Sequence, residues 1–366
     1  MRKILQWLLK RPLTWLADKL SSAPEKEEVF ASMSQLLQEI HNKKTGSGLV
    51  IPFDLDKGKF IILSDQHKGI RDDADDFKGA DKTYTHALQY YFDQGFYFIN
   101  LGDCEELWEN KPDITVKKNA GELSQEDKFL QQNRYYRVFG NHDLQWKYDI
   151  PRNQFLEPAF RNALKIYEGL ILKTNWNSRE FSIFMTHGHQ GDKRSDGNAF
   201  STWVIANVWT PVQRFLGINV NSVSDSFELV DRHNIIMYEW SATRQNLVFI
   251  SGHTHKPVFA SLDHIERLNK ELSEARQKND TAAIQSIQEE LKRREAEYAG
   301  KQFQKTMVQP SYFNSGCCCF EDGDITGIEI ENDNIRLIRW KEINGTCERT
   351  ILEQSPLSYI FDKLRK

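Results

Sequence analysis

The sequence predicts an α/β layered domain, because short β-rich runs alternate with amphipathic helical stretches. Residues 60–63, 97–101 and 247–250 have the length and apolar composition of buried strands. Helical spacing appears between such runs at Tyr84–Phe92 and Asp127–Asn133. This alternation favours sheets covered by helices. The length of 366 residues allows one large domain with additions.

The composition fits a globular enzyme. Hydrophobic residues make up 39% and aromatic residues 12%, which exceeds the content of a disordered chain. The net charge is −4 and no arginine-rich stripe is present, so we expect no nucleic-acid partner. No run of about 18 apolar residues and no signal-peptide core occurs, so we expect a cytoplasmic protein.

Residues 1–48 are predicted to form an amphipathic helical arm. Residues 1–20 are basic and rich in Leu and Trp, a composition typical of helices that lie in a membrane interface. Two interpretations stay open: peripheral contact with the inner face of the membrane, or packing on the catalytic domain or a partner. Val29–Ile40 gives a second amphipathic stretch, and Lys43–Ser47 reads as a linker.

Five short polar segments each follow a β-rich run, where strand ends present side chains on a rigid scaffold. Mixed imidazole and carboxylate ligands suit Mn, Fe, Zn or Ni, whereas all-oxygen sites suit Mg or Ca. The sequence therefore predicts two divalent transition metals, with Mn preferred and Fe, Zn or Ni as alternatives. The segments are Ser64–His67, Gly102–Glu106, Gly140–Asp143, Thr186–His189 and Gly252–His255.

Two ions held about 3.5–4 Å apart need a shared carboxylate, which we assign to Asp103. His142 is the predicted catalytic residue that faces the substrate, with Asp143 fixing its tautomer and orientation. The remaining predicted ligands are Asp65, His67 and His255 for one metal, and Asn141, His187 and His253 for the other.

Two positions in these segments leave alternatives. His187 emerges directly from its strand and is the preferred ligand, while His189 remains the alternative. Glu106 is expected to support a ligand rather than to bind metal. Lys193 and Arg194 either contact a phosphate or form a solvated pair.

In this order, the motifs D-x-H, G-D-x-x-E, G-N-H-D, H-G-H and G-H-T-H resemble those of the calcineurin-like metallophosphoesterase family, from about Ile51 to His255. The resemblance implies an αββα four-layer sandwich, a dinuclear centre, a metal-bridging hydroxide as nucleophile and hydrolysis of phosphate esters. Gly102–Trp108 is similar to the G-D-x-x-E-x-W pattern of UDP-2,3-diacylglucosamine hydrolases, which have a helical lid over acyl chains. The chain departs from their commonest form, which has Arg where His142 stands.

The predicted core spans residues 49–261. Two segments, one within this core and one after it, bear on the predicted substrate and partner. Residues 199–240 are unusually apolar and form either a buried helical cap or a lid over the metals. Residues 262–300 predict an inserted helical hairpin whose narrow apolar stripe either seals only its own helices or also joins a homodimer. Residues 301–366 are expected to complete the core with strands to about Ile343, followed by a tail.

Five cysteines lack the spacing of a disulfide scaffold, and three of them are adjacent at Cys317–Cys319. In a strand, adjacent side chains point to alternate faces, so a compact metal site is not expected there. The sequence instead predicts a buried β segment in a reducing compartment.

The predicted function is metal-dependent hydrolysis of a phosphate ester or pyrophosphate, on a phosphate-containing small molecule or lipid. The apolar stretch and the basic arm favour an amphiphilic substrate such as a UDP-sugar lipid. The alternatives are a soluble phosphomonoesterase or nucleotide phosphodiesterase, and a non-catalytic scaffold. The complete set of ligand residues disfavours the scaffold.

Overall fold

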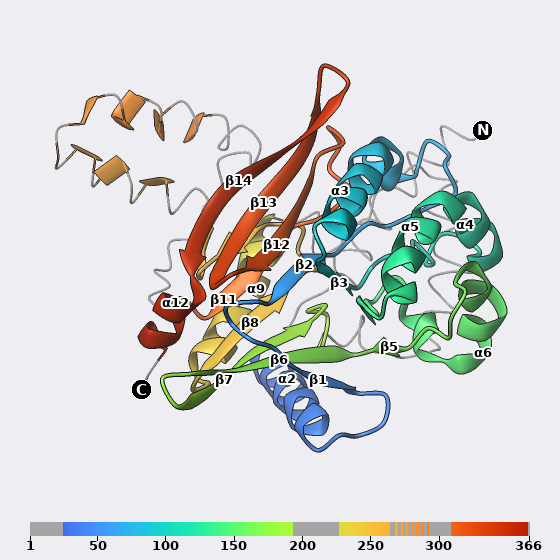
Figure 1. The fold of residues 1–366 in the computed structure, drawn as a ribbon, viewed down its shortest axis with the longest axis horizontal. Coiled ribbons are helices and arrows are strands. Elements are labelled where there is room, and N and C mark those ends of the chain that lie inside the picture. The colour runs from blue at the N-terminus through green and yellow to red at the C-terminus, as the bar shows by residue number, and fades with distance from the viewer. Residues whose placement is uncertain are drawn as a thin grey trace, which may run out of the picture.

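Two β-sheets packed face to face form the centre of the molecule in a computed structural model (Figure 1). The structure describes residues 25–192, 227–263 and 309–364, with separate positions between 268 and 292. The basic segment 1–20, Lys193, Arg194 and most of the predicted cap lie outside these residues, so what the sequence predicts for them stays a prediction.

Each sheet has seven strands among the described residues. The first contains, in spatial order, β1 (Gly48–Pro52), β6 (Gly169–Trp176), β7 (Arg179–Thr186), β8 (Leu247–Ser251), β11 (Tyr312–Asn314), β9 (Val258–Phe259) and β10 (Leu262–Asp263). The second contains β14 (Thr346–Pro356), β13 (Asn334–Ile343), β12 (Ile325–Glu331), β2 (Lys59–Leu63), β3 (Tyr97–Leu101), β4 (Tyr135–Val138) and β5 (Ile166–Tyr167).

Helices cover both outer faces. The described α-helices are α2 (Lys26–His41), α3 (Asp81–Asp93), α4 (Pro112–Lys118), α5 (Ala120–Gln131), α6 (Asp149–Pro151), α9 (Phe227–Ala242) and α12 (Leu357–Lys363). Further helical turns of other types are η1 (Asp76–Gly79), η2 (Leu144–Lys147), η3 (Arg152–Leu156) and η4 (Glu157–Ala159). None of the described helices combines the length and apolar character that a bilayer crossing requires.

Three apolar clusters show that the layers are stacked as helix, sheet, sheet and helix. In β3, Phe98 faces the cluster under α3 and α5, while Ile99 and Leu101 face the other sheet. In β7, Met185 faces the space between the sheets, while Phe184 packs with α2 and α9. In these central strands, the alternation with a period of two residues buries both faces of the sheet. The predicted αββα four-layer sandwich is confirmed.

Helix α2, which the sequence placed in the arm, is part of the outer layer beside α9. Val29, Met33, Leu36 and Ile40 recur at helical spacing and are all buried against the first sheet. Gly48 then starts β1 directly. The segment from residue 26 onward therefore packs as an integral layer of the sandwich.

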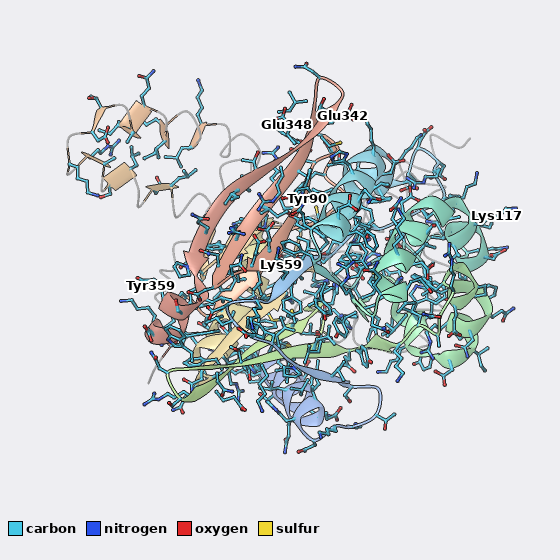
Figure 2. The ribbon with its side chains drawn as sticks, viewed as in Figure 1. Lys59, Tyr90, Lys117, Glu342, Glu348 and Tyr359 are labelled. Atoms are coloured by element: carbon cyan, nitrogen blue, oxygen red, sulfur yellow. The ribbon has the colours of Figure 1, made fainter. Side chains whose placement is uncertain are left out.

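The far end of the chain extends beyond the predicted strands. β13 and β14 form a long hairpin whose tip carries Glu342 and Glu348 (Figure 2). β14 and α12 follow the predicted strand limit of about Ile343. In the inserted segment, the described leucines Leu268, Leu272 and Leu291 form a cluster of their own. These inserted positions stand apart from the two sheets (Figure 1).

Candidate metal centre

Five strand ends bring the predicted segments to one edge of the sandwich. β2, β3 and β4 run parallel in one sheet, and β7 runs parallel to β8 in the other. One of the polar segments lies at the end of each of these strands, and only β4 is separated from its segment by a residue, Phe139. Because parallel strands present their carboxyl ends at the same edge, residues far apart in sequence meet there.

Asp65 and Asp103 lie at the middle of this cluster and are 0% and 1% exposed. His187 Nε2 lies 3.0 Å from Asp103 Oδ2 and 3.9 Å from Asp65 Oδ1. His67 Nε2 lies 3.7 Å and 3.9 Å from the same two oxygens. His255 Nε2 approaches Asp65 Oδ1 to 3.3 Å. Two buried carboxylates are thus surrounded by imidazoles.

The donor atoms fall into sets that are compact enough to hold a metal ion. Within each set, every donor atom lies within 4.8 Å of the others. The sets around the two carboxylates, taken from the described residues, are Asp65 with His67 and His255, Asp103 with His187 and His253, and Asp103 with His67 and His142.

Two orphaned atoms test whether a metal fits. Asn141 Oδ1 and His253 Nε2 are buried, and neither has a hydrogen-bond partner in the described part of the chain. The backbone carbonyl oxygen of Asn141, in contrast, accepts a hydrogen bond from Trp108 Nε1 at 2.7 Å. A buried polar atom without a partner costs about 1–3 kcal/mol, which coordination to a cation would offset. The residues therefore fit a site for divalent ions.

The backbone at these positions is unusual. A positive φ outside glycine is uncommon and tends to occur at functional sites, where the surrounding structure holds it in place. Five of the seven predicted ligands have one, namely Asp65 (54°), His67 (48°), Asp103 (51°), His253 (69°) and His255 (57°).

Two glycines let the backbone approach the carboxylates. A Cβ on Gly140 would lie 2.1 Å from Asp103 Oδ1 and 2.5 Å from the Asp103 nitrogen. A Cβ on Gly252 would lie 2.5 Å from Asp65 Oδ2. Both distances are too short for a Cβ atom, so only glycine allows the backbone to lie this close to the two carboxylates.

His142 is oriented by Glu106. Its Nδ1 lies 2.6 Å from Glu106 Oε2, and the same oxygen lies 2.9 Å from His67 Nδ1. Trp108 stacks on the His142 ring with centroids 4.0 Å apart. Glu106 therefore supports a predicted metal ligand and the predicted catalytic histidine at once.

The predicted pairing of Asp143 with His142 is wrong. Asp143 turns inward, where its carboxylate accepts hydrogen bonds from the backbone of Gly140 at 2.6 Å and of Cys104 at 3.0 Å. Arg137 also donates to it at 3.4 Å. Adjacent residues in a turn point in different directions, so Asp143 stabilises the loop from below instead of touching the imidazole.

Beneath the site lies a network of charges that sequence reasoning missed. Lys68 Nζ lies 2.6 Å from Glu126 Oε1 and 3.5 Å from Glu105 Oε1. Arg137 pairs with Glu105 and Asp143. All five side chains are fully buried. In the sequence, the signal for this network is the charged Arg137 within the short segment Tyr135–Val138, which forms β4.

The charges set the protonation of the site. Burial alone would lower the pKa of His142, but the charges of Glu106 and Asp103 raise it to about 9. Burial would raise the pKa of Glu106, yet His142 and His67 lower it to about 2. Burial would also raise the pKa of Asp103, which His187 and His142 hold well below its usual range. The site thus favours ionised carboxylates beside a protonated His142.

The structure separates the two candidates in Thr186–His189. His187 belongs to the set with Asp103 and its Nδ1 lies 2.9 Å from the Leu101 carbonyl. His189 is in none of the sets among the described residues, and burial together with the charge of His187 lowers its pKa to about 3. This geometry favours His187 as the ligand.

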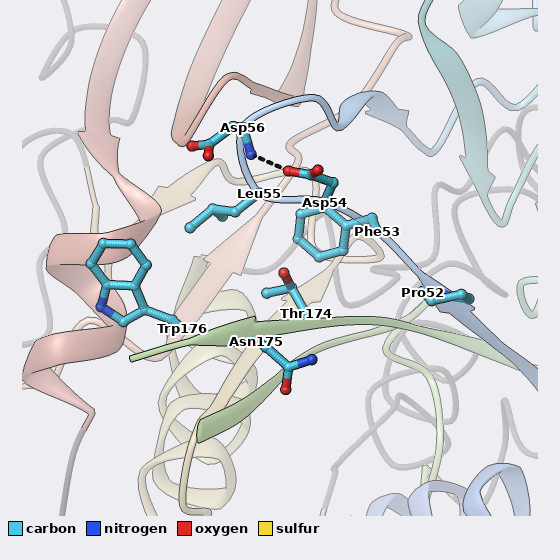
Figure 3. A pocket seen from close by; sticks show the side chains of 8 residues that line it. All are labelled: Pro52, Phe53, Asp54, Leu55, Asp56, Thr174, Asn175 and Trp176. Atoms are coloured by element: carbon cyan, nitrogen blue, oxygen red, sulfur yellow. Dashed lines mark hydrogen bonds between the residues drawn. The ribbon is translucent and has the colours of Figure 1, made fainter. Parts of the chain in front are cut away.

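A surface hollow of about 570 Å³ lies elsewhere, at the opposite end of β7 (Figure 3). It carries Asp54 and Asp56, and the Asp56 backbone donates a hydrogen bond to Asp54 Oδ1 at 3.0 Å. Trp176 and Phe53 line its apolar side. Because Trp176 pairs with Arg179 at the start of β7, while His187 follows the end of that strand, the hollow is remote from the cluster.

Similar solved structures include vacuolar protein sorting 29 from Cryptosporidium parvum, with 11% identity and a TM-score of 0.32, covering 82% of this chain and 98% of that chain. Wild-type Vps29 complexed with Zn²⁺ from Entamoeba histolytica has 13% identity and a TM-score of 0.30, covering 81% and 99%. A search of curated proteins finds no match.

The family comparison covers the site itself. The family model described as calcineurin-like phosphoesterase matches residues 58–257, which is more than half of the chain and contains all five polar segments. The chain therefore belongs to the calcineurin-like phosphoesterase family.

Proposed function

We propose that this protein is a dinuclear metal-dependent phosphoesterase. The observation that carries the proposal is the pair of buried carboxylates, Asp65 and Asp103, whose ion-pair partners within the described residues are all histidines. A structural ion pair would use Lys or Arg, whereas imidazoles suit transition metals. Asp103 is the proposed bridging ligand, and the other ligands are those predicted from the sequence.

Two divalent ions bound there would supply Lewis acidity and a water molecule activated for attack on phosphorus. His142 would donate a proton to the leaving oxygen, because Glu106 and Asp103 hold it in the protonated form. Glu106 would keep the His142 ring aimed at the substrate, since it engages Nδ1 and leaves Nε2 free to act. Trp108 would restrict the same ring by stacking.

The proposed substrate is an amphiphilic phosphate or pyrophosphate such as a UDP-sugar lipid. Support comes from the Glu106 and Trp108 pair of the G-D-x-x-E-x-W pattern and from the apolar composition of residues 199–240. Residues 1–20 would provide peripheral membrane contact, and residues 262–300 would provide a homodimer contact. A soluble phosphomonoester or nucleotide phosphodiester is the alternative substrate, and a scaffold is the remaining alternative function.

The test has two stages. Metal analysis of the purified protein is followed by Mn²⁺-supplemented assays on p-nitrophenyl phosphate and bis-p-nitrophenyl phosphate. We expect about two ions per chain and hydrolysis of at least one compound. Absence of both metal and turnover would contradict the enzyme and favour the non-catalytic scaffold. A panel of UDP-sugar lipids and soluble nucleotide diesters, with release of UMP or phosphate measured, then distinguishes the amphiphilic substrate from the soluble one.

A further inference from the structure

The three adjacent cysteines lie in the loop between β11 and β12, beside the predicted metal ligand His255. Contrary to the predicted β segment, residues 315–324 lie between these strands and belong to neither. The Cys318 thiol is directed to the Thr326 carbonyl at 3.8 Å. The Cys317 and Cys319 thiols instead approach each other and His255.

The loop is held firmly in this position. Its Cys318 nitrogen donates a hydrogen bond to the Asp65 carbonyl at 3.1 Å, and the Cys317 carbonyl accepts one from the Thr326 nitrogen at 2.9 Å. Ser315 Oγ lies 2.7 Å from Ser64 Oγ, which ties the loop to the end of β2. The thiols are therefore positioned by backbone contacts on both sides, which lowers the cost of ordering them around a ligand.

The other ring nitrogen of His255 has an unusual neighbour. His187 Nδ1 and His67 Nδ1 both face oxygen acceptors, as metal-binding histidines usually do. His255 Nδ1 faces sulfur, with Cys319 Sγ at 3.9 Å. A nitrogen and a sulfur bound tetrahedrally to one zinc ion lie about 3.6 Å apart, so this spacing is close to that of a shared ion.

We propose that Cys317 Sγ, Cys319 Sγ and His255 Nδ1 form a separate site for a thiophilic divalent ion such as Zn²⁺. A ring nitrogen of His255 and the two sulfur atoms lie within 4.8 Å of one another, and the nitrogen that faces Cys319 Sγ is Nδ1. Two sulfurs and one imidazole nitrogen, with water as the fourth ligand, make a tetrahedral set that selects zinc over manganese. Cys319 is partly exposed, which gives an ion access from solvent, while Cys317 is buried.

This site shares one imidazole with the proposed dinuclear centre. A neutral imidazole offers a lone pair at one nitrogen and an N–H at the other. An ion bound to His255 Nδ1 leaves an N–H at Nε2, which Asp65 Oδ1 can accept at 3.3 Å. The two sites therefore compete for His255, and by linkage each weakens metal binding at the other.

Cobalt spectroscopy of the full chain tests the site without an activity assay. The chain is reduced, stripped of metal with a chelator and titrated with Co²⁺. We expect a sulfur-to-cobalt charge-transfer band, because the dinuclear centre offers only nitrogen and oxygen ligands. The band should weaken in Cys317→Ser and in Cys319→Ser, disappear when both are replaced, and remain unchanged in Cys347→Ser, which removes a buried thiol on β14. Circular dichroism verifies that each variant is folded.

The outcomes separate this site from the proposed enzyme. A folded, reduced chain that binds Co²⁺ without the band, or a band that keeps its full strength when both cysteines are replaced, overturns the sulfur site whether or not the protein hydrolyses phosphate esters. Added Mn²⁺ should reduce the band by drawing His255 to the dinuclear centre. A band that is unchanged by saturating Mn²⁺ overturns the competition.

Discussion

Glu106 Oε2 lies 2.6 Å from His142 Nδ1, and this carboxylate oxygen is the nearest charge to the proposed proton donor. The contact raises the pKa of His142, so the imidazolium is present below about pH 9 and is lost as the pH rises through that value. A reaction that needs the acid form should therefore have an alkaline limit set by His142.

Glu106→Gln should move this alkaline limit to lower pH. Glutamine keeps an oxygen that can accept the Nδ1–H hydrogen bond but carries no charge, so the imidazolium is less stabilised and loses its proton sooner. The measurement is the pH profile of kcat. Glu348→Gln, at the exposed tip of the β13–β14 hairpin (Figure 2), is the matched control and should leave the limit in place. An unshifted limit in Glu106→Gln would contradict the coupling.

His142→Ala should reduce kcat while the protein keeps its metals. Loss of a general acid lowers turnover by about 10²–10⁴-fold. The effect should be larger for an alkyl phosphate than for p-nitrophenyl phosphate, whose leaving group needs less protonation. Metal content by mass spectrometry checks the second half of the prediction, and a variant that loses its metals would show that His142 acts as a ligand.

Asp103→Asn should lose metal and activity together. The amide is neutral and cannot damp the repulsion of two cations, so at least one ion should leave on dialysis. Asp54→Asn, in the remote surface hollow (Figure 3), is the control and should retain both. Full activity and full metal content in Asp103→Asn would remove Asp103 from the bridging position.

The sequence allowed the sandwich to be predicted, and most of the ligands predicted at its strand ends lie in compact donor sets around Asp65 and Asp103, because metal chemistry restricts residue types there. It could not show which neighbour orients His142. Asp143 is next in the chain but faces inward, while Glu106 arrives from another strand end. The directions of these side chains depend on a positive φ at positions such as Asp103 and His255. Because these residues are not glycines, the sequence does not indicate that their backbone adopts this conformation.

The surroundings of the buried charges and the position of the cysteine loop could not be predicted from the sequence either. Arg137 and Lys68 look like surface residues in the sequence, and only the fold shows that carboxylates surround them. Cys317 was expected in a strand, but its loop is held by hydrogen bonds to Asp65 and Thr326 that connect distant strands. These features depend on tertiary contacts, so local patterns do not specify the partners of Arg137, Lys68 or Cys317.

Gly140→Ala should weaken both stability and metal binding. The added Cβ would lie 2.1 Å from Asp103 Oδ1 and 2.5 Å from the Asp103 nitrogen, and backbone atoms cannot move aside without shifting the loop. Overpacking of this kind costs about 1–3 kcal/mol. Gly121→Ala, in α5 with nothing within 4 Å, is the matched control and should stabilise the protein by about 0.4–1 kcal/mol. Urea denaturation and metal analysis of both variants distinguish a local clash from a general effect of alanine.

Lys68→Met should destabilise the fold more than any surface charge removal. The substitution leaves Glu126 buried without its closest cation, 2.6 Å away, and breaking a buried pair on one side costs about 3–5 kcal/mol. Lys59→Met removes the half-exposed pair with Glu331 and should cost less than about 1 kcal/mol. The double variant Lys68→Met with Glu126→Gln should recover part of the loss, because it removes the unpaired charge. Equal urea midpoints for Lys68→Met and Lys59→Met would show that the buried network does not depend on Lys68.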